Sequence, residues 1–123
     1  MARFVLSSPT AYARIQTDDI AYIQADGNYA HIVLTNGYRI TFARKLGDME
    51  QELERQNVRT HIRVGKSLIV NKNFVFFVNL TDQTLRLLAP MMSKPIELSA
   101  SRDALKELVE SLKNEKESIY ENG

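Results

Sequence analysis

The chain has 123 residues, the length of one ordinary domain. Hydrophobic residues make up 44% and charged residues 25%, with a net charge of only +1, values typical of a folded soluble protein. The lack of cysteine excludes disulfides and thiolate metal sites, and the lack of a signal peptide or of an apolar run near the roughly 18–20 residues of a membrane span predicts a cytoplasmic protein.

The first half of the chain reads as short strands joined by tight turns. The segment "IAYIQA" (20–25) is rich in strand-forming residues, and residues 26–28 (Asp-Gly-Asn) tolerate a positive φ. Residues 29–35 predict a second strand. Asn36-Gly37 then gives a strong hairpin signal before "YRITF" (38–42).

A helix is predicted around Leu46, Met49 and Leu53, because these apolar residues recur at helical spacing and form one face. The β-branched and aromatic run at 58–80 is again strand-like, with breaks expected at 65–67 and at 71–73.

Two further strands, "QTLRLLA" and "PIELS", precede a C-terminal helix that Ser99 or Ser101 can cap. After Lys113 the sequence is polar, and we expect it to fray. About seven short strands without alternating helices predict a mostly β fold of small antiparallel sheets, with one short internal helix and a C-terminal helix. The apolar stripe of the last helix consists of Leu105, Leu108, Val109 and Leu112. The core candidates are Tyr22, Ile23, Ile32, Leu34, Ile69, Val70, Phe74, Phe76, Leu85 and Leu87.

Gly65, Lys66 and Ser67 match the end of the phosphate-binding loop of many nucleotide-binding proteins. That loop requires G-x-x-x-x-G-K-[ST] between a strand and a helix, because the early glycine lets the loop wrap the phosphates and the helix N-terminus faces the anion. Here Thr60 occupies the position of the early glycine, and "LIVN" after Ser67 predicts a strand. We therefore reject a nucleotide site.

No pattern of catalytic or metal-binding residues stands out. His31 and His61 lie in separate elements without an acidic partner at a ligand-like spacing, and the chain has neither a G-x-S-x-G elbow nor a cysteine nucleophile. We expect no enzyme activity, no metal and no cofactor.

The charge is distributed unevenly along the chain. Residues 1–102 carry a net charge of +4, whereas the segment from Asp103 to the end has six acidic residues and three lysines. The stretch from Arg55 to Thr81 contains five basic residues and no acidic one, namely Arg55, Arg59, Arg63, Lys66 and Lys72. This stretch is compatible with a polyanion partner and equally with an ordinary solvated surface.

Two segments, "DDIAYIQADGNYAHIVLTNGYRI" and "HIRVGKSLIVNKNFV", resemble the LytTR family of bacterial DNA-binding domains. The family shows an I-x-Y-I-x-A-x-G-N-Y segment, a short helix, a segment similar to F-x-R-[VI]-H-[KR]-S-x-[IV]-V-N, and a final strand and helix that "PIELSASRDALKELVESL" resembles. The chain departs from this pattern at Gly65, where the family usually has histidine, and at His61, where it usually has phenylalanine. Affinity or specificity is therefore expected to differ from that of typical members.

The resemblance implies a transcriptional regulator that binds duplex DNA sequence-specifically, with loops instead of a recognition helix in successive major grooves. It implies three contact regions: Asn28, Tyr29 and His31; Gly65, Lys66 and Ser67; and Ser101 with Arg102. It also implies paired direct repeats as target sites, so that two copies can share one promoter.

The residue chemistry supports these roles to different degrees. Lys66 can donate to guanine or to phosphate, although an exposed lysine needs no partner. Arg63 points off a strand face toward either a phosphate or an ion pair. Arg102 near a helix start opposes the helix dipole, which a polyanion would offset. His31 suits either a base edge or a half-buried structural position, and Asn71 suits a turn cap.

We expect the DNA-binding domain to span residues 11–113, between an N-terminal segment (1–10) and a polar C-terminal tail (114–123). Because only about ten residues precede it, the chain is expected to be a stand-alone regulator or an excised domain, without a receiver domain. The alternative hypothesis is a LytTR-like interaction module that binds another regulator and has weak or no DNA affinity; the neutral net charge, Gly65 and the acidic last helix favour it.

Overall fold

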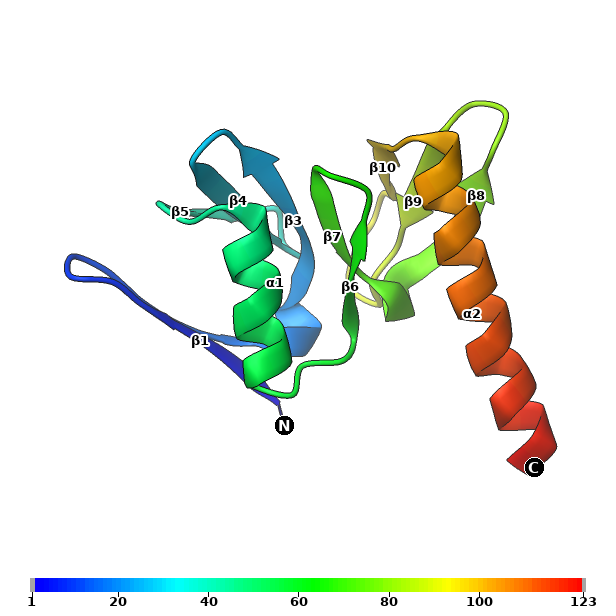
Figure 1. Cartoon of the computed structure of the whole chain (residues 1–123), viewed down its shortest axis with the longest axis horizontal. Coiled ribbons are helices and arrows are strands. Elements are labelled where there is room, and N and C mark those ends of the chain that lie inside the picture. Colours follow the sequence, from blue (N-terminus) through cyan, green and yellow to red (C-terminus); the bar gives the residue numbers. More distant parts are fainter. Residues whose placement is uncertain (1, 123) are drawn as a thin grey trace.

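The computed structural model describes residues 2–122, with side chains described for residues 2–115. These residues form ten strands, two α-helices and two 3-10 turns, as Figure 1 shows. The strands are β1 (Arg3–Ser7), β2 (Tyr12–Gln16), β3 (Ile20–Asp26), β4 (Tyr29–Leu34), β5 (Arg39–Phe42), β6 (His61–Val64), β7 (Leu68–Asn71), β8 (Val75–Asn79), β9 (Thr84–Leu87) and β10 (Ile96–Ser99). The helices are α1 (Leu46–Arg55) and α2 (Arg102–Asn122), and the 3-10 turns are η1 (Thr17–Asp19) and η2 (Lys72–Phe74).

The central layer is a five-stranded antiparallel sheet in the order β5-β4-β3-β7-β6. All four residues of β7 (68–71) are buried, because other elements cover both faces of this strand. Ile69 faces one core, and Leu68 and Val70 face the other. A strand buried on both sides must be apolar at consecutive positions, which explains why this segment does not alternate.

Two hydrophobic cores lie on opposite sides of this layer. On one side α1 and the β1–β2 hairpin pack against the sheet, and on the other side the β10-β9-β8 sheet and α2 do so (Figure 1). The first core consists of Phe4, Leu6, Ile15, Ile20, Ile23, Ala30, Ile32, Phe42, Leu46, Met49, Leu53, Val58 and Ile69. The second core consists of Ala21, Val64, Leu68, Val70, Leu85, Leu87, Leu98, Ala104, Leu105 and Leu108.

The mostly β architecture with antiparallel sheets and two helices is confirmed, but the expected number of about seven strands was too low. Residues 1–10 had been expected as a separate segment. Residues 3–7 instead form β1, whose Phe4 and Leu6 belong to the first core. The alternation of these two residues with polar neighbours is a strand signal, although it covers only a few positions.

One core prediction was wrong. Phe76 is 53% exposed, because the pairing of β8 with β9 shifts register between Val75 and Phe77 and turns this side chain away from the core. Six of the other candidates are fully buried, namely Ile23, Ile32, Ile69, Val70, Leu85 and Leu87.

The C-terminal helix α2 continues to Asn122, well past Lys113, where fraying was expected. The predicted stripe is confirmed up to Leu112, which packs against the second core. Side chains from residue 116 onward lie outside the described residues. Within residues 2–122, none of the helices is both long enough and apolar enough to cross a membrane.

Candidate nucleic-acid interface

The turn between β6 and β7 is held in shape by one arginine. Arg63 Nε donates to the carbonyl oxygen of Gly65 at 3.1 Å, and Arg63 Nη2 donates to that of Lys66 at 3.3 Å. Its Nη1 donates to Glu50 Oε1 of α1 at 3.1 Å. Of the two partners expected for Arg63, the ion pair is therefore present. The guanidinium holds the turn backbone while the Lys66 side chain is exposed.

A backbone hydrogen bond joins this turn to the β3–β4 hairpin. The amide of Ala25 donates to the carbonyl oxygen of Ser67 at 2.9 Å. The hairpin turns through Gly27 and Asn28, and Gly27 has a φ of +61°, as a glycine at the first central position of a type II′ turn requires. Asn28 is exposed, and Tyr29 beside it is also exposed.

The same turn lies against the start of α2 on its other side. Ser101 caps the helix, because its Oγ accepts from the amide of Ala104 at 3.2 Å. Gly65 lies next to Ala104, so that a Cβ at position 65 would stand 3.2 Å from the Ala104 Cβ. Turn and helix start together line an open groove of about 540 Å³, which Lys66 and Ser67 border.

The three predicted contact regions therefore lie in one row. The β3–β4 hairpin tip, the β6–β7 turn and the start of α2 stand side by side at one end of the molecule, the upper edge in Figure 1. They are separated in sequence, and the antiparallel pairing of β3 with β7 brings the first two together. Eight of the nine predicted residues lie in this row or, like Arg63, hold it in place.

His31 is the exception. Its Nε2 lies 2.9 Å from Asp26 Oδ2 and its Nδ1 lies 2.8 Å from Thr41 Oγ1, so both ring nitrogens have partners within the protein. The side chain is half-buried. A hydrogen bond from a nitrogen of this ring to a base would require breaking one of these bonds.

In the folded protein, most of the basic residues between Arg55 and Thr81 are paired with carboxylates. Carboxylates from other parts of the chain pair with three of these five basic residues. The pairs are Arg55–Glu52, Arg63–Glu50 and Lys72–Glu115. Arg59 donates to Asn57 Oδ1, whereas the Lys66 ammonium has no side-chain partner within residues 2–115. Lys66 thus remains accessible to an external anion.

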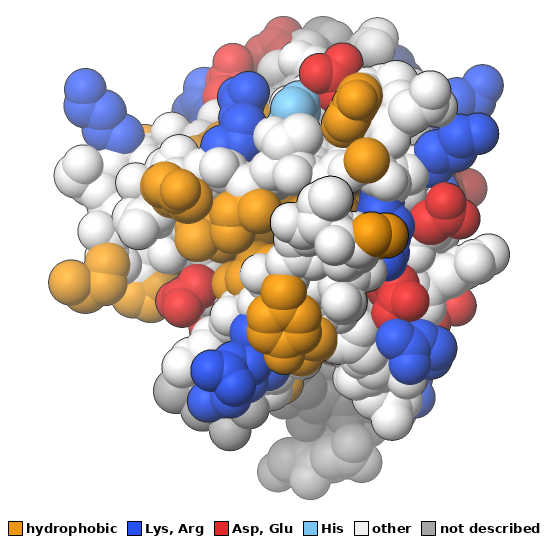
Figure 2. Space-filling model, turned by 90° about the vertical axis from the view of Figure 1, so that its left-hand side faces the viewer, with side chains coloured by type: hydrophobic (Ala, Val, Ile, Leu, Met, Phe, Trp, Pro, Cys, Tyr) orange, Lys and Arg blue, Asp and Glu red, His pale blue; other side chains and the backbone are white. Residues whose placement is uncertain are grey.

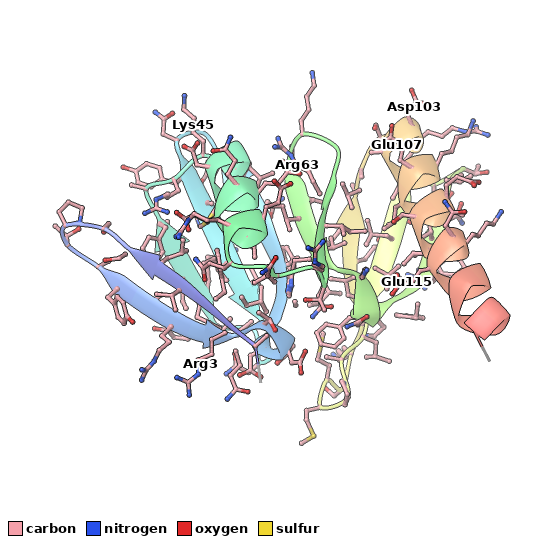
Figure 3. The ribbon with its side chains drawn as sticks, turned by 60° about the horizontal axis from the view of Figure 1, so that its bottom comes forward. Arg3, Lys45, Arg63, Asp103, Glu107 and Glu115 are labelled. Carbon is pink, nitrogen blue, oxygen red and sulfur yellow. The ribbon has the colours of Figure 1, made fainter. Side chains whose placement is uncertain are left out.

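Acidic side chains also border the row. Asp103 and Glu107 line the groove together with Lys66, and Figure 3 shows both near the start of α2. On the face that carries the β1–β2 hairpin, the described Lys and Arg side chains are scattered around an apolar area and form no continuous basic surface (Figure 2). The row is consequently a surface of mixed charge.

Lys45 is a further basic side chain near this row. It immediately precedes α1, is exposed, and makes no side-chain cap for that helix. Phe42 pairs with Ala30, so this segment lies close to the β3–β4 hairpin tip, and Figure 3 shows Lys45 there. Its neighbour Arg44 is instead bound to the Ser7 carbonyl oxygen at 2.7 Å.

Two polar residues of the central sheet serve the fold. Asn71 Oδ1 accepts from the amide of Asn73, which confirms the predicted turn cap. His61 is 6% exposed, and burial lowers its pKa, so the neutral ring prevails near neutral pH. Its Nε2–H can then donate to the Ile20 carbonyl oxygen at 2.9 Å, while Nδ1 accepts from Thr60 Oγ1.

The family model of the LytTr DNA-binding domain matches residues 11–113, which is most of the chain, and the chain therefore belongs to this family. The fold is similar to that of the LytTr DNA-binding domain of a Bacillus cereus protein, with a TM-score of 0.60 and 18% sequence identity over 89% of this chain and 97% of that chain. No curated protein matches the sequence significantly.

Proposed function

We propose that this protein is a bacterial transcriptional regulator that binds duplex DNA sequence-specifically through the row formed by Asn28, Tyr29, Lys66, Ser101 and Arg102. In this proposal the DNA-binding domain spans residues 11–113, and strand β1 before it packs against its first core. Residues 114–122, the last part of α2, lie outside the domain. Membership of a DNA-binding family supports a DNA partner.

The observation that carries the proposal is the exposed ammonium of Lys66, which has no side-chain partner within residues 2–115, on a turn that Arg63 holds in shape. A lysine on a protruding loop reaches guanine O6 and N7 in the major groove, or a phosphate oxygen. The hairpin tip with Asn28 on one side supplies an amide that can read adenine. On the other side, Arg102 at the start of α2 suits a phosphate.

A second candidate function is an interaction module that binds another regulator instead of DNA. Asp103 and Glu107 beside Lys66 favour it, because carboxylates at the interface repel phosphates. Such a module would bind its partner protein equally well with and without duplex DNA.

A salt titration of duplex binding separates the two candidates. The target is first selected from a random duplex pool, and its affinity is then measured from low to moderate salt. DNA binding through several cations predicts that log affinity falls linearly with log salt concentration, with a slope near the number of phosphates contacted. Absence of any duplex binding at low salt would leave the interaction module as the function.

A further inference from the structure

Among the glycines with a left-handed backbone in the described residues, Gly65 is the one with another side chain close to the position of an added Cβ. Gly27, Gly37 and Gly65 have φ values of +61°, +88° and +68°. A Cβ at Gly27 or Gly37 would meet nothing within 4 Å, whereas a Cβ at Gly65 would stand 3.2 Å from the Ala104 Cβ. Position 65 therefore combines a conformational requirement for glycine with a steric one.

Neither side of this contact can move freely. Ala104 is buried in the first turn of α2, its amide is bonded to Ser101 Oγ, and the adjacent Leu105 is fully buried in the second core. On the opposite side, Arg63 and the Ala25 amide hold the carbonyl oxygens of the turn. An added Cβ would thus have to displace the turn or the helix start by a few tenths of an ångström.

We propose that Gly65 is a positioning residue of the DNA interface: it lets the β6–β7 turn pack directly against α2, so that Lys66 and the start of α2 with Arg102 approach the duplex as one rigid unit. The inference rests on the proposed function. Hydrogen bonds to base edges tolerate only a narrow range of donor–acceptor distances, so the spacing between turn and helix start contributes to sequence selectivity.

The test is a set of four variants with three readouts, namely duplex affinity, thermal unfolding and the amide resonances of Ser101 and Arg102. Gly65→Ala introduces both the backbone strain and the contact with Ala104. Gly37→Ala introduces the same kind of strain on the β4–β5 hairpin, away from the row and without a steric contact. Ala104→Gly removes the opposing methyl group, and Gly65→Ala/Ala104→Gly keeps the strain but relieves the contact. Affinity for the selected duplex and thermal unfolding are measured for each variant.

We expect Gly65→Ala to bind the duplex about five- to tenfold more weakly, the change that the loss of one net hydrogen bond produces. Gly37→Ala should unfold at a similarly reduced temperature but bind within about twofold of the original protein, as Ala104→Gly should. The double variant should regain most of the lost affinity without regaining its unfolding temperature. Amide resonances of Ser101 and Arg102 should shift in Gly65→Ala and return in the double variant.

Unchanged affinity of Gly65→Ala, or no recovery in the double variant, would overturn the inference while the original protein still binds DNA. If the original protein binds no duplex at low salt, the proposed function fails and the inference fails with it. The two failures are therefore distinguished by the binding of the unsubstituted chain.

Discussion

Arg63 Nη1 lies 3.1 Å from Glu50 Oε1, and this pair joins the β6–β7 turn to helix α1. The remaining nitrogens of the same guanidinium bind two carbonyl oxygens of the turn. The planar fork of arginine is suited to several acceptors at once, whereas a lysine ammonium is a single point of charge. One side chain therefore connects a helix, a strand and the loop that carries Lys66.

Arg63→Lys should loosen the turn while keeping the charge. The free energy of unfolding should fall by about 0.5–1.5 kcal/mol, the net value of a lost hydrogen bond, because the pair is partly exposed. Duplex affinity should fall as well, since Lys66 is held less firmly. Arg55→Lys is the matched control, because Arg55 pairs with Glu52 on α1 without touching the turn. Equal duplex affinities of the two variants would argue against a role of Arg63 in holding the β6–β7 turn for DNA binding.

Lys66→Ala should weaken duplex binding by roughly 1–3 kcal/mol if the ammonium reads a base edge, and the loss should be largest for the selected sequence. A phosphate contact instead predicts a uniform loss and a salt slope smaller by about one. The unfolding temperature should not change, because the side chain is exposed. Lys94→Ala removes an exposed lysine from the β9–β10 loop, at the end of β10 away from the start of α2, and should bind like the original protein. If Lys66→Ala binds the duplex as tightly as the original protein, the DNA contact lies elsewhere.

His61 should make the stability depend on pH. Since burial lowers its pKa below the ordinary 6.5, the unfolded chain takes up a proton on this ring more readily than the folded protein does. Above pH 6.5 the titration of His61 therefore does not change the free energy of unfolding. The free energy of unfolding should fall as the pH drops through 6.5 toward the lower pKa of the folded protein. Chemical denaturation at about pH 7.5 and about pH 5.5 measures this.

His61→Phe is the companion variant, and its stability should depend less on pH over the same interval. Asn71 Nδ2 also donates to the Ile20 carbonyl oxygen, at 3.3 Å, so that oxygen keeps a partner in the variant. An undiminished pH dependence would assign the effect to another group.

Val70→Asp should prevent folding, because Val70 is 0% exposed and a carboxylate there would have no partner. A loss of about 4 kcal/mol or more, the upper end for single substitutions, approaches the whole stability of a small domain. Phe76→Asp is the control, since Phe76 is exposed on an edge strand. It should lower the free energy of unfolding by less than about 1 kcal/mol. Circular dichroism of the two variants distinguishes them, and a folded Val70→Asp would contradict the burial.

Local patterns in the sequence determined the class of fold and the strongest elements. Helical spacing identified α1 through Met49 and Leu53, and the Asn36-Gly37 pair identified the β4–β5 hairpin, because the physical signals for both lie within a few neighbouring residues. The residues after Ser67 also predicted a strand instead of a helix, and this prediction excluded a nucleotide-binding loop. The motifs around Gly27 and Lys66 indicated the family before any geometry was known.

Tertiary structure alone decided what surrounds the site. The contact of Gly65 with Ala104, the Arg63–Glu50 pair and the acids beside Lys66 join residues that are distant in the chain. No periodicity encodes them, because they depend on which strands pair and on how α2 packs over the sheet. The exposure of Phe76 has the same origin, since a one-residue shift of strand register reverses the face of a side chain.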